Sequence, residues 1–218
     1  FTPPCTPLPH AYVQVASFWV VEQHNGGTCA LRDTSGCLRG QELHVPSLPA
    51  DVLYLALIAW YTHVSVKPAI GLGKNLSTDA LLHHVATLAL LALTEVWGLQ
   101  RIGLLAHALF SITNPLLSIS KVLHFIDARR LKKPAFLLFA LSYLVARVLA
   151  VPVVVLPVTL GDGMQVLPPA LGYACNAFLL GLYAIILFWF GRIIGMLLTG
   201  KLDERPRVVM TATFKRRA

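Results

Sequence analysis

The chain has 218 residues, of which 56% are hydrophobic and only 13% are charged. A soluble domain carries about a quarter charged residues, so this composition excludes an ordinary soluble protein and indicates a polytopic membrane protein. The net charge of +8 would suggest a nucleic-acid partner for a soluble chain. Here the basic residues cluster at the ends of apolar segments, so we predict membrane topology as their role and no nucleic-acid partner.

Five apolar segments are long enough to cross a membrane as helices. They are residues 47–66, 79–97, 98–125, 134–158 and 168–198. A shorter apolar segment at 9–21 is either the end of a span or an interfacial helix. We therefore predict an all-α polytopic transmembrane bundle at 47–199. An N-terminal apolar segment and polar loop (1–46) precede it, and a basic tail (200–218) follows.

Prolines interrupt two of these segments. Pro115 removes a backbone donor inside the span at 98–125 and is expected to kink it. Pro152 and Pro157 are expected to bend or end the next span near Val158, with a turn at 159–165.

The positive charges predict which end of the bundle faces the cytosol. Lys67 with Lys74, the segment 127–133 and the C-terminal tail all fall on one side of the predicted spans. Cys29 and Cys37 share a glycine-rich loop on the opposite side, in a compartment where a disulfide could persist. The sequence leaves open whether they are bridged.

Polar residues recur at helical spacing along the two central spans. In the first, Asp79, His83, Thr87 and Thr94 fall roughly on one face, with His84 beside it. In the second, polar residues follow at steps of four, three, four and three: His107, Ser111, Asn114, Ser118 and Lys121. We predict that the two stripes face each other or a shared cavity.

His83 lies one helical turn after Asp79, so the carboxylate could orient an imidazole that acts as a general base. A satisfied polar cluster near the membrane surface explains the same spacing. Arg147 lies within a span and needs a carboxylate, a carbonyl or a lipid headgroup, with Asp79 and Glu95 as candidate partners. The eight histidines form no HxxxH or HxxHH box and no zinc spacing, so we predict no metal and no cofactor.

Several stretches resemble the TLC-domain family, which includes ceramide synthases and the translocon-associated TRAM proteins. They are residues 79–93, 101–125, 146–152 and 180–194. The resemblance implies a TLC-type bundle with membrane lipids as partners and the endoplasmic reticulum as location, a mitochondrial inner membrane or another organelle being the alternative. The chain begins with Phe1, so we expect a presequence or a further N-terminal helix to precede it.

Ceramide synthases carry a His-Asp pair and a further Asp in the helix after an Arg-x-Gly motif. Counted from Arg101, these positions hold Phe110, Ser111 and Asn114 here, whereas Lys121 keeps its place. The pair His83-His84 is also retained. This pattern resembles the branch of the family that is not ceramide synthase.

We predict a protein that binds lipid, or takes part in membrane-lipid homeostasis, through a polar or lipid-accessible cavity. The predicted ligand-binding residues are Asp79, Arg101, His107, Ser111, Asn114, Lys121 and Arg147. One alternative is an accessory subunit of a larger membrane complex, with other membrane subunits as partners. A second is an N-acyltransferase resembling ceramide synthase, with His83 or His84 as base or nucleophile and acyl-CoA as substrate.

Overall fold

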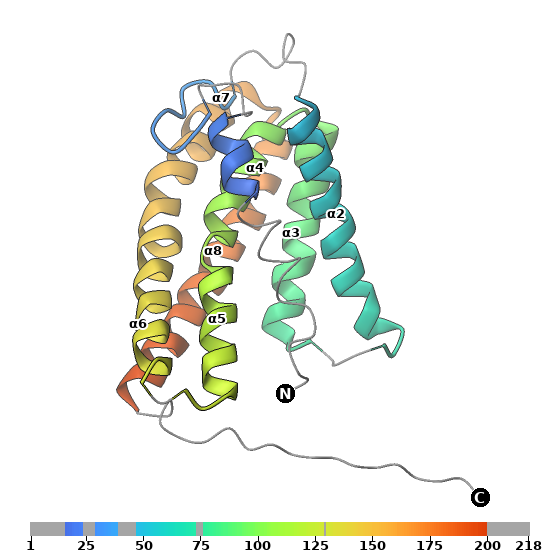
Figure 1. Cartoon of the computed structure of the whole chain (residues 1–218). Coiled ribbons are helices and arrows are strands. Elements are labelled where there is room, and N and C mark those ends of the chain that lie inside the picture. Colours follow the sequence, from blue (N-terminus) through green and yellow to red (C-terminus); the bar gives the residue numbers. More distant parts are fainter. Residues whose placement is uncertain (1–15, 24–28, 39–46, 73–75, 129, 200–218) are drawn as a thin grey trace, which may run out of the picture.

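The computed structural model describes residues 16–23, 29–38, 47–72, 76–128 and 130–199. This part of the chain forms a bundle of helices that run alternately up and down (Figure 1). The predicted basic tail, Lys74 and the start of the N-terminal apolar segment lie outside the described residues.

The long helices follow the predicted spans closely. They are α2 (Leu48–Ala69), α3 (Thr78–Val96), α4 (Gln100–Ser111), α5 (Asn114–Phe125), α6 (Lys132–Tyr143) and α8 (Pro169–Leu198). Three π-helical segments extend α6 into the short helix α7: η1 (Leu144–Leu149), η2 (Val151–Val155), η3 (Val158–Asp162) and α7 (Gly163–Val166). The predicted all-α polytopic bundle is confirmed.

Four helical segments of the described chain are long and apolar enough to cross a membrane. They are Thr78–Val96, Gln100–Phe125, Lys132–Val166 and Pro169–Leu198. The first predicted span, α2, is not among these four because polar residues such as Asp51 and His63 lower its hydropathy. Its 22 residues still give a length of about 33 Å, which matches a hydrocarbon core of about 30 Å.

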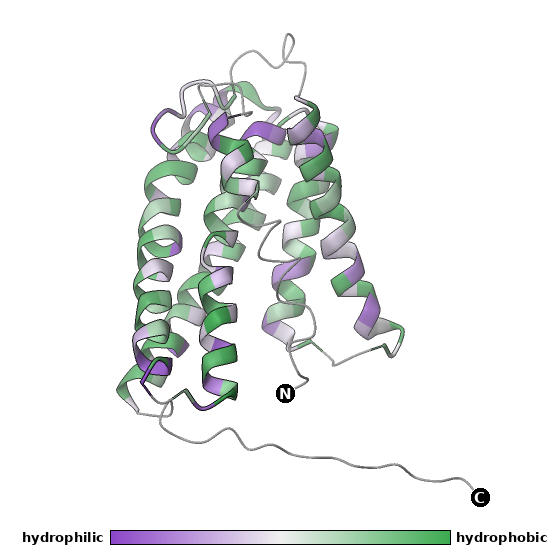
Figure 2. Cartoon of the chain, viewed as in Figure 1, coloured by the Kyte–Doolittle hydropathy of each residue, from purple (hydrophilic) through white to green (hydrophobic). Residues whose placement is uncertain are grey.

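Apolar residues make up most of the helices and many are exposed on the outer surface, while polar residues are more frequent toward the helix ends (Figure 2). This apolar outer surface contacts membrane lipids. The end of α2, the start of α3 and the turn between α5 and α6 lie at one end of the bundle (Figure 1). Lys67 and the segment 127–133 therefore share one end, as their charge predicts. The loop that carries Cys29 and Cys37 lies at the opposite end (Figure 1).

Pro115 divides the predicted span at 98–125 into two helices. Helix α4 ends at Ser111, residues 112–113 form a turn, and α5 begins at Asn114. A proline ring conflicts with the carbonyl four residues earlier, which is that of Ser111. The predicted kink thus takes the form of a break between α4 and α5.

The predicted end at Val158 and the turn at 159–165 are wrong, because the chain stays helical to Val166. Pro152 and Pro157 have no backbone N–H to donate, and the hydroxyl of Tyr183 on α8 donates to the carbonyl of Val148 in this stretch at 3.0 Å. The amide of Asn176, also on α8, donates to the carbonyl of Thr159 at 3.1 Å. Donors on a neighbouring helix therefore satisfy carbonyls of the proline-rich stretch and let it cross as a helix.

A close contact explains the glycine of the Arg-x-Gly motif. The Tyr54 hydroxyl bonds with the carbonyl of Leu91 at 3.0 Å and with the Thr94 hydroxyl. A Cβ atom at Gly103 would lie 3.0 Å from the Tyr54 oxygen and 3.1 Å from the Thr94 oxygen. The glycine therefore allows α4 to approach this hydrogen-bonded pair.

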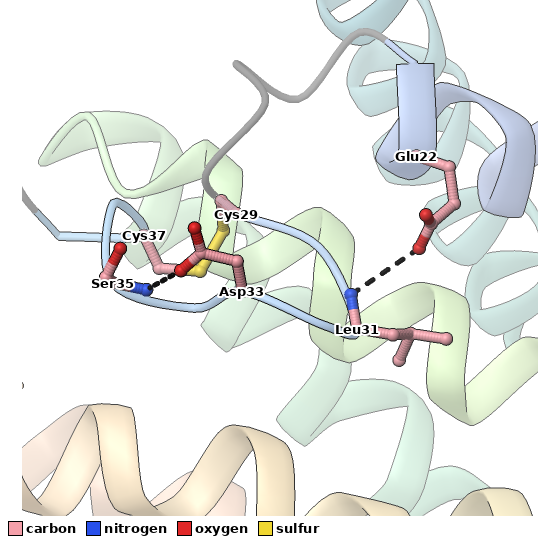
Figure 3. The surroundings of a disulfide bond; sticks show 6 residues. All are labelled: Glu22, Cys29, Leu31, Asp33, Ser35 and Cys37. Atoms are coloured by element: carbon pink, nitrogen blue, oxygen red, sulfur yellow. Dashed lines mark hydrogen bonds between the residues drawn. A yellow bond between two sulfur atoms is a disulfide. The ribbon is translucent and has the colours of Figure 1, made fainter.

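Cys29 and Cys37 form a disulfide, with their Cα atoms 4.6 Å apart (Figure 3). The N–H of Ser35 donates to the Asp33 carboxylate at 2.9 Å, and the Ser35 hydroxyl and N–H hold the pKa of that carboxyl below its usual value. Both cysteines are buried against the bundle. The structure thus resolves the pairing that the sequence leaves open, and it packs the loop on one end of the core.

Candidate functional site

One cavity lies between α3, α4, α8 and the π-helical stretch, and we call it the histidine cavity. Its volume is about 80 Å³ and its walls are almost wholly apolar. It extends from Leu38 and Gly163, beneath the disulfide loop, to His83 and His107 near the opposite end of α3. The cavity is therefore long and narrow, with imidazole groups at one end.

Four aromatic rings, the Tyr–His cluster, gather at that end: Tyr61, His83, His84 and His107. The centroid of the Tyr61 ring lies 5.6 Å from that of His84, 5.9 Å from that of His107 and 6.5 Å from that of His83. The Nδ1 atoms of His83 and His84 are buried and accept or donate no hydrogen bond within the described chain. The cluster brings three helices to one point and leaves two ring nitrogens available to a ligand or a proton.

The second cavity, which we call the basic cavity, lies between α5, α6, η1 and α8. Its volume is about 780 Å³, and the cations that line it are Lys121, Arg147 and Arg192. Phe136 near the start of α6 and Thr199 after α8 also line it, so it lies at the end of the bundle that carries the basic segment 127–133. The long helices thus line a narrow apolar cavity and a wider basic one that opens to the surface.

Arg147 is the buried cation of the basic cavity, with only 6% of its surface exposed. Its guanidinium donates to the side-chain oxygen of Asn114 and lies 4.8 Å from the centroid of the Tyr143 ring. The predicted partners Asp79 and Glu95 are both wrong for Arg147. Asp79 bonds to α8, as described next, and the amide of Gln100 donates to Glu95 at 2.7 Å.

Asp79 and Trp189 separate the two cavities. The indole N–H of Trp189 donates to the Asp79 carboxylate at 2.5 Å, and Arg192 lies 3.8 Å from the same oxygen. The Trp189 ring contacts His83 with centroids 5.1 Å apart, and Trp189 also lines the basic cavity. Trp189 therefore forms a partition between the basic cavity and the Tyr–His cluster.

The structure divides the predicted stripe instead of gathering it around one cavity. His83 and His107 line the histidine cavity, whereas Asn114, Lys121 and Arg147 line the basic cavity. His83 and His107 lie on α3 and α4, whereas Asn114 and Lys121 lie on α5 and Arg147 lies on η1.

Four other predicted site residues line neither cavity: Asp79, His84, Arg101 and Ser111. Ser111 is buried and donates to the carbonyl of Ala108 on its own helix at 3.4 Å. Arg101 lies at the start of α4, at the end of the bundle far from the Tyr–His cluster. A ligand-binding role for Ser111 and Arg101 gains no support from their positions.

The site also includes Tyr61, Trp189 and Arg192, which sequence reasoning did not identify as part of it. Trp189 and Arg192 lie three residues apart on α8, so they share a helix face. That spacing in the sequence could have indicated that Trp189 and Arg192 act at the same place. In the described part of the chain, no group of three or more His, Cys, Asp or Glu residues could hold a metal ion.

Comparison with known proteins adds an independent result. A family profile described as the TLC domain (TRAM_LAG1_CLN8) matches residues 11–195. The ceramide synthase LOH1 of Arabidopsis thaliana is 31% identical over 57% of this chain and 44% of its own length. The ceramide synthase 1 LOH3 of the same plant is 26% identical over 73% of this chain and 56% of its own length. Ceramide synthase 5 of Mus musculus is 24% identical over 72% of this chain and 38% of its own length.

The chain thus spans about half or less of the length of these curated relatives. Because the relatives are ceramide synthases, the expected assignment to the branch outside the ceramide synthases is not supported. The similarity supports a function related to membrane lipids. With a match over most of its length, and with the helical bundle described above, the chain belongs to the TLC-domain family.

Proposed function

We propose that the protein binds the acyl chain of a membrane lipid in the histidine cavity, with the Tyr–His cluster at the polar end of that chain. The observation that carries the proposal is an elongated apolar cavity that ends on imidazole groups. Binding sites for small apolar ligands have this form, with apolar walls and few polar groups that fix orientation. The similarity to ceramide synthases, whose names imply lipid chemistry, supports the same reading.

The volume of the cavity limits how an acyl chain can enter. At about 80 Å³ it has room for about three groups the size of a water molecule or methylene. A longer chain would displace side chains of the wall, such as Leu38 and Phe110. We therefore expect the cavity to widen when it is occupied and to close around the chain.

Native mass spectrometry of gently purified protein tests the proposal. Ala106 lines the cavity, and Ala106→Phe adds a ring too large for the vacant space. We expect wild-type protein to retain a lipid and the variant to retain several-fold less. Ala92→Phe on α3 is the matched control, because Ala92 is exposed on the outer surface and lines neither cavity. Equal retention by all three proteins would exclude the histidine cavity as the binding site.

N-acyl transfer from acyl-CoA is a second candidate, favoured by the Tyr–His cluster at the end of an apolar cavity. An imidazole with an unpaired buried nitrogen can act as a base or accept an acyl group. The reaction joins an amine to the acyl carbonyl and releases the thiol of coenzyme A. Incubation with acyl-CoA and a sphingoid base tests it, and activity that survives both His83→Ala and His84→Ala would remove these residues from the mechanism.

We also infer that the protein resides in the endoplasmic reticulum, by its similarity to ceramide synthases. The disulfide lies at the end of the bundle opposite the basic segment 127–133, which suits a lumenal loop and a cytosolic basic end. Imaging with markers of the reticulum and of the mitochondrial inner membrane distinguishes the two locations.

A further inference from the structure

The basic cavity contains a buried cation with no acid beside it. Within the described chain, no carboxylate lies within ion-pair distance of Arg147, and Asp79 faces Arg192 instead. The other charged residues that line the cavity, Lys121 and Arg192, are also positive. The cavity therefore presents an excess of positive charge to whatever occupies it.

An uncompensated arginine inside a membrane bundle is costly, by several kcal/mol on most scales. The guanidinium has five N–H donors, and Asn114 accepts one of them. The Nε atom is buried and has no hydrogen-bond partner in the described chain. Donors arranged as a planar fork match the oxygens of a phosphate or a carboxylate. Arg147 is thus prepared for an anionic ligand that the neighbouring residues do not supply.

The remaining walls of the basic cavity are mostly apolar, apart from Asn114, Tyr143 and Thr199. They are formed mainly by Leu117, Phe136, Phe139, Ile193 and Met196. The volume of about 780 Å³ lies within the range of about 300–1,000 Å³ that is usual for ligand cavities. An apolar wall beside three cations fits a ligand that joins an anionic group to a hydrocarbon part.

We propose that the basic cavity binds the phosphate of a membrane phospholipid, with Arg147 as the buried contact and Lys121 and Arg192 at the exposed side. The apolar walls then hold the adjoining part of the lipid. Phosphate is the shared chemistry, and a soluble phosphate compound is the other source that the experiment separates.

The test reconstitutes the full chain in nanodiscs of phosphatidylcholine that contain phosphatidic acid as a minor lipid, then measures lipids retained after detergent extraction by native mass spectrometry. We expect enrichment of phosphatidic acid over phosphatidylcholine. Arg147→Gln should lower the enrichment about tenfold or more, because a buried charge-assisted contact is lost. Arg147→Lys should give an enrichment between those of wild type and Arg147→Gln, since lysine keeps the positive charge but lacks the planar fork of donors.

Two further variants keep the outcome decisive. Lys121→Gln at the exposed side should lower the enrichment about twofold to fivefold, and it remains informative if Arg147→Gln does not fold. Arg130→Gln is the control, because it removes an equal charge from the same end of the bundle outside the cavity. Equal loss in Arg130→Gln, or no enrichment in wild type, would overturn the proposal.

Competition separates the two sources of phosphate. Inorganic phosphate and coenzyme A, added separately, should leave the retained phosphatidic acid unchanged. Displacement by either compound at concentrations near that of the protein would assign the cavity to a soluble phosphate ligand and overturn the lipid proposal. The site is independent of acyl binding in the histidine cavity, so Ala106→Phe should retain phosphatidic acid as wild type does.

Discussion

Replacing Ala106 by leucine should stabilise the protein while it weakens lipid binding. Ala106 lies on α4 and lines the histidine cavity, whose volume is about 80 Å³. Leucine adds three carbon atoms, which together need about 90 Å³ when each occupies the space of a water molecule. The added side chain therefore nearly matches the vacant space.

The expected size of the effect follows from the cost of cavities in packed interiors. At about 24 cal/mol per Å³, a vacant 80 Å³ costs about 2 kcal/mol. Because the new side chain does not fit the space perfectly, it recovers only part of this free energy. We therefore expect Ala106→Leu to raise the free energy of unfolding by about 1 kcal/mol. For a chain of this size that corresponds to about 2–4 °C in melting temperature.

The measurement is thermal unfolding of delipidated protein in detergent, together with the lipid retained by the undelipidated protein. Ala92→Leu on the lipid-facing side of α3 should change neither quantity. A gain in stability combined with a loss of lipid would show that the vacant space is kept for a ligand at the expense of stability. A lower melting temperature with unchanged lipid retention would refute the argument, because the cavity would then be neither fillable nor used.

Three further predictions concern the scaffold and the partition. Gly103→Ala should lower the free energy of unfolding by about 1–2 kcal/mol in a denaturation assay, because its Cβ would crowd the Tyr54 hydroxyl, and unchanged stability would contradict the close approach. Replacing both Cys29 and Cys37 by serine should lower the free energy of unfolding by about 2.5 kcal/mol, because the loop is no longer closed. The loss should be no larger than the loss measured when the disulfide of the wild-type protein is reduced. Asp79→Asn should speed modification of the Tyr–His cluster by a histidine reagent applied from the basic end, since it weakens the bond that holds the partition; unchanged modification would show that another contact holds it.

The long apolar runs predicted the helices, because the hydrocarbon core offers no water to a crossing segment. Its backbone N–H and C=O groups must therefore bond to one another within the helix. The break before α5 was also predictable, since Pro115 acts through local geometry. The helical run from Val158 to Val166 was not, because it depends on contacts with another helix, such as the hydrogen bond that Asn176 on α8 donates to the carbonyl of Thr159. A local signal for termination was thus overridden by contacts distant in sequence.

The site shows the same limit. Helical spacing drew attention to His83 and His107, which line the histidine cavity, and to Lys121, which lines the basic cavity. It could not show that one stripe serves two cavities, since that depends on which helices pack against α4 and α5. Spacing also could not identify the neighbour of Arg147, because Asn114 is 33 residues away and meets it only through packing.

The partition made by Trp189 has a consequence for any ligand longer than one cavity. A single amphiphile could place its headgroup at Arg147 and its tail among the walls of the histidine cavity only if the indole moves off the His83 ring. Such a movement breaks the hydrogen bond to Asp79 and opens a continuous passage from the basic end of the bundle toward the disulfide loop. One rotating side chain would then decide whether the protein holds two short occupants or one long one.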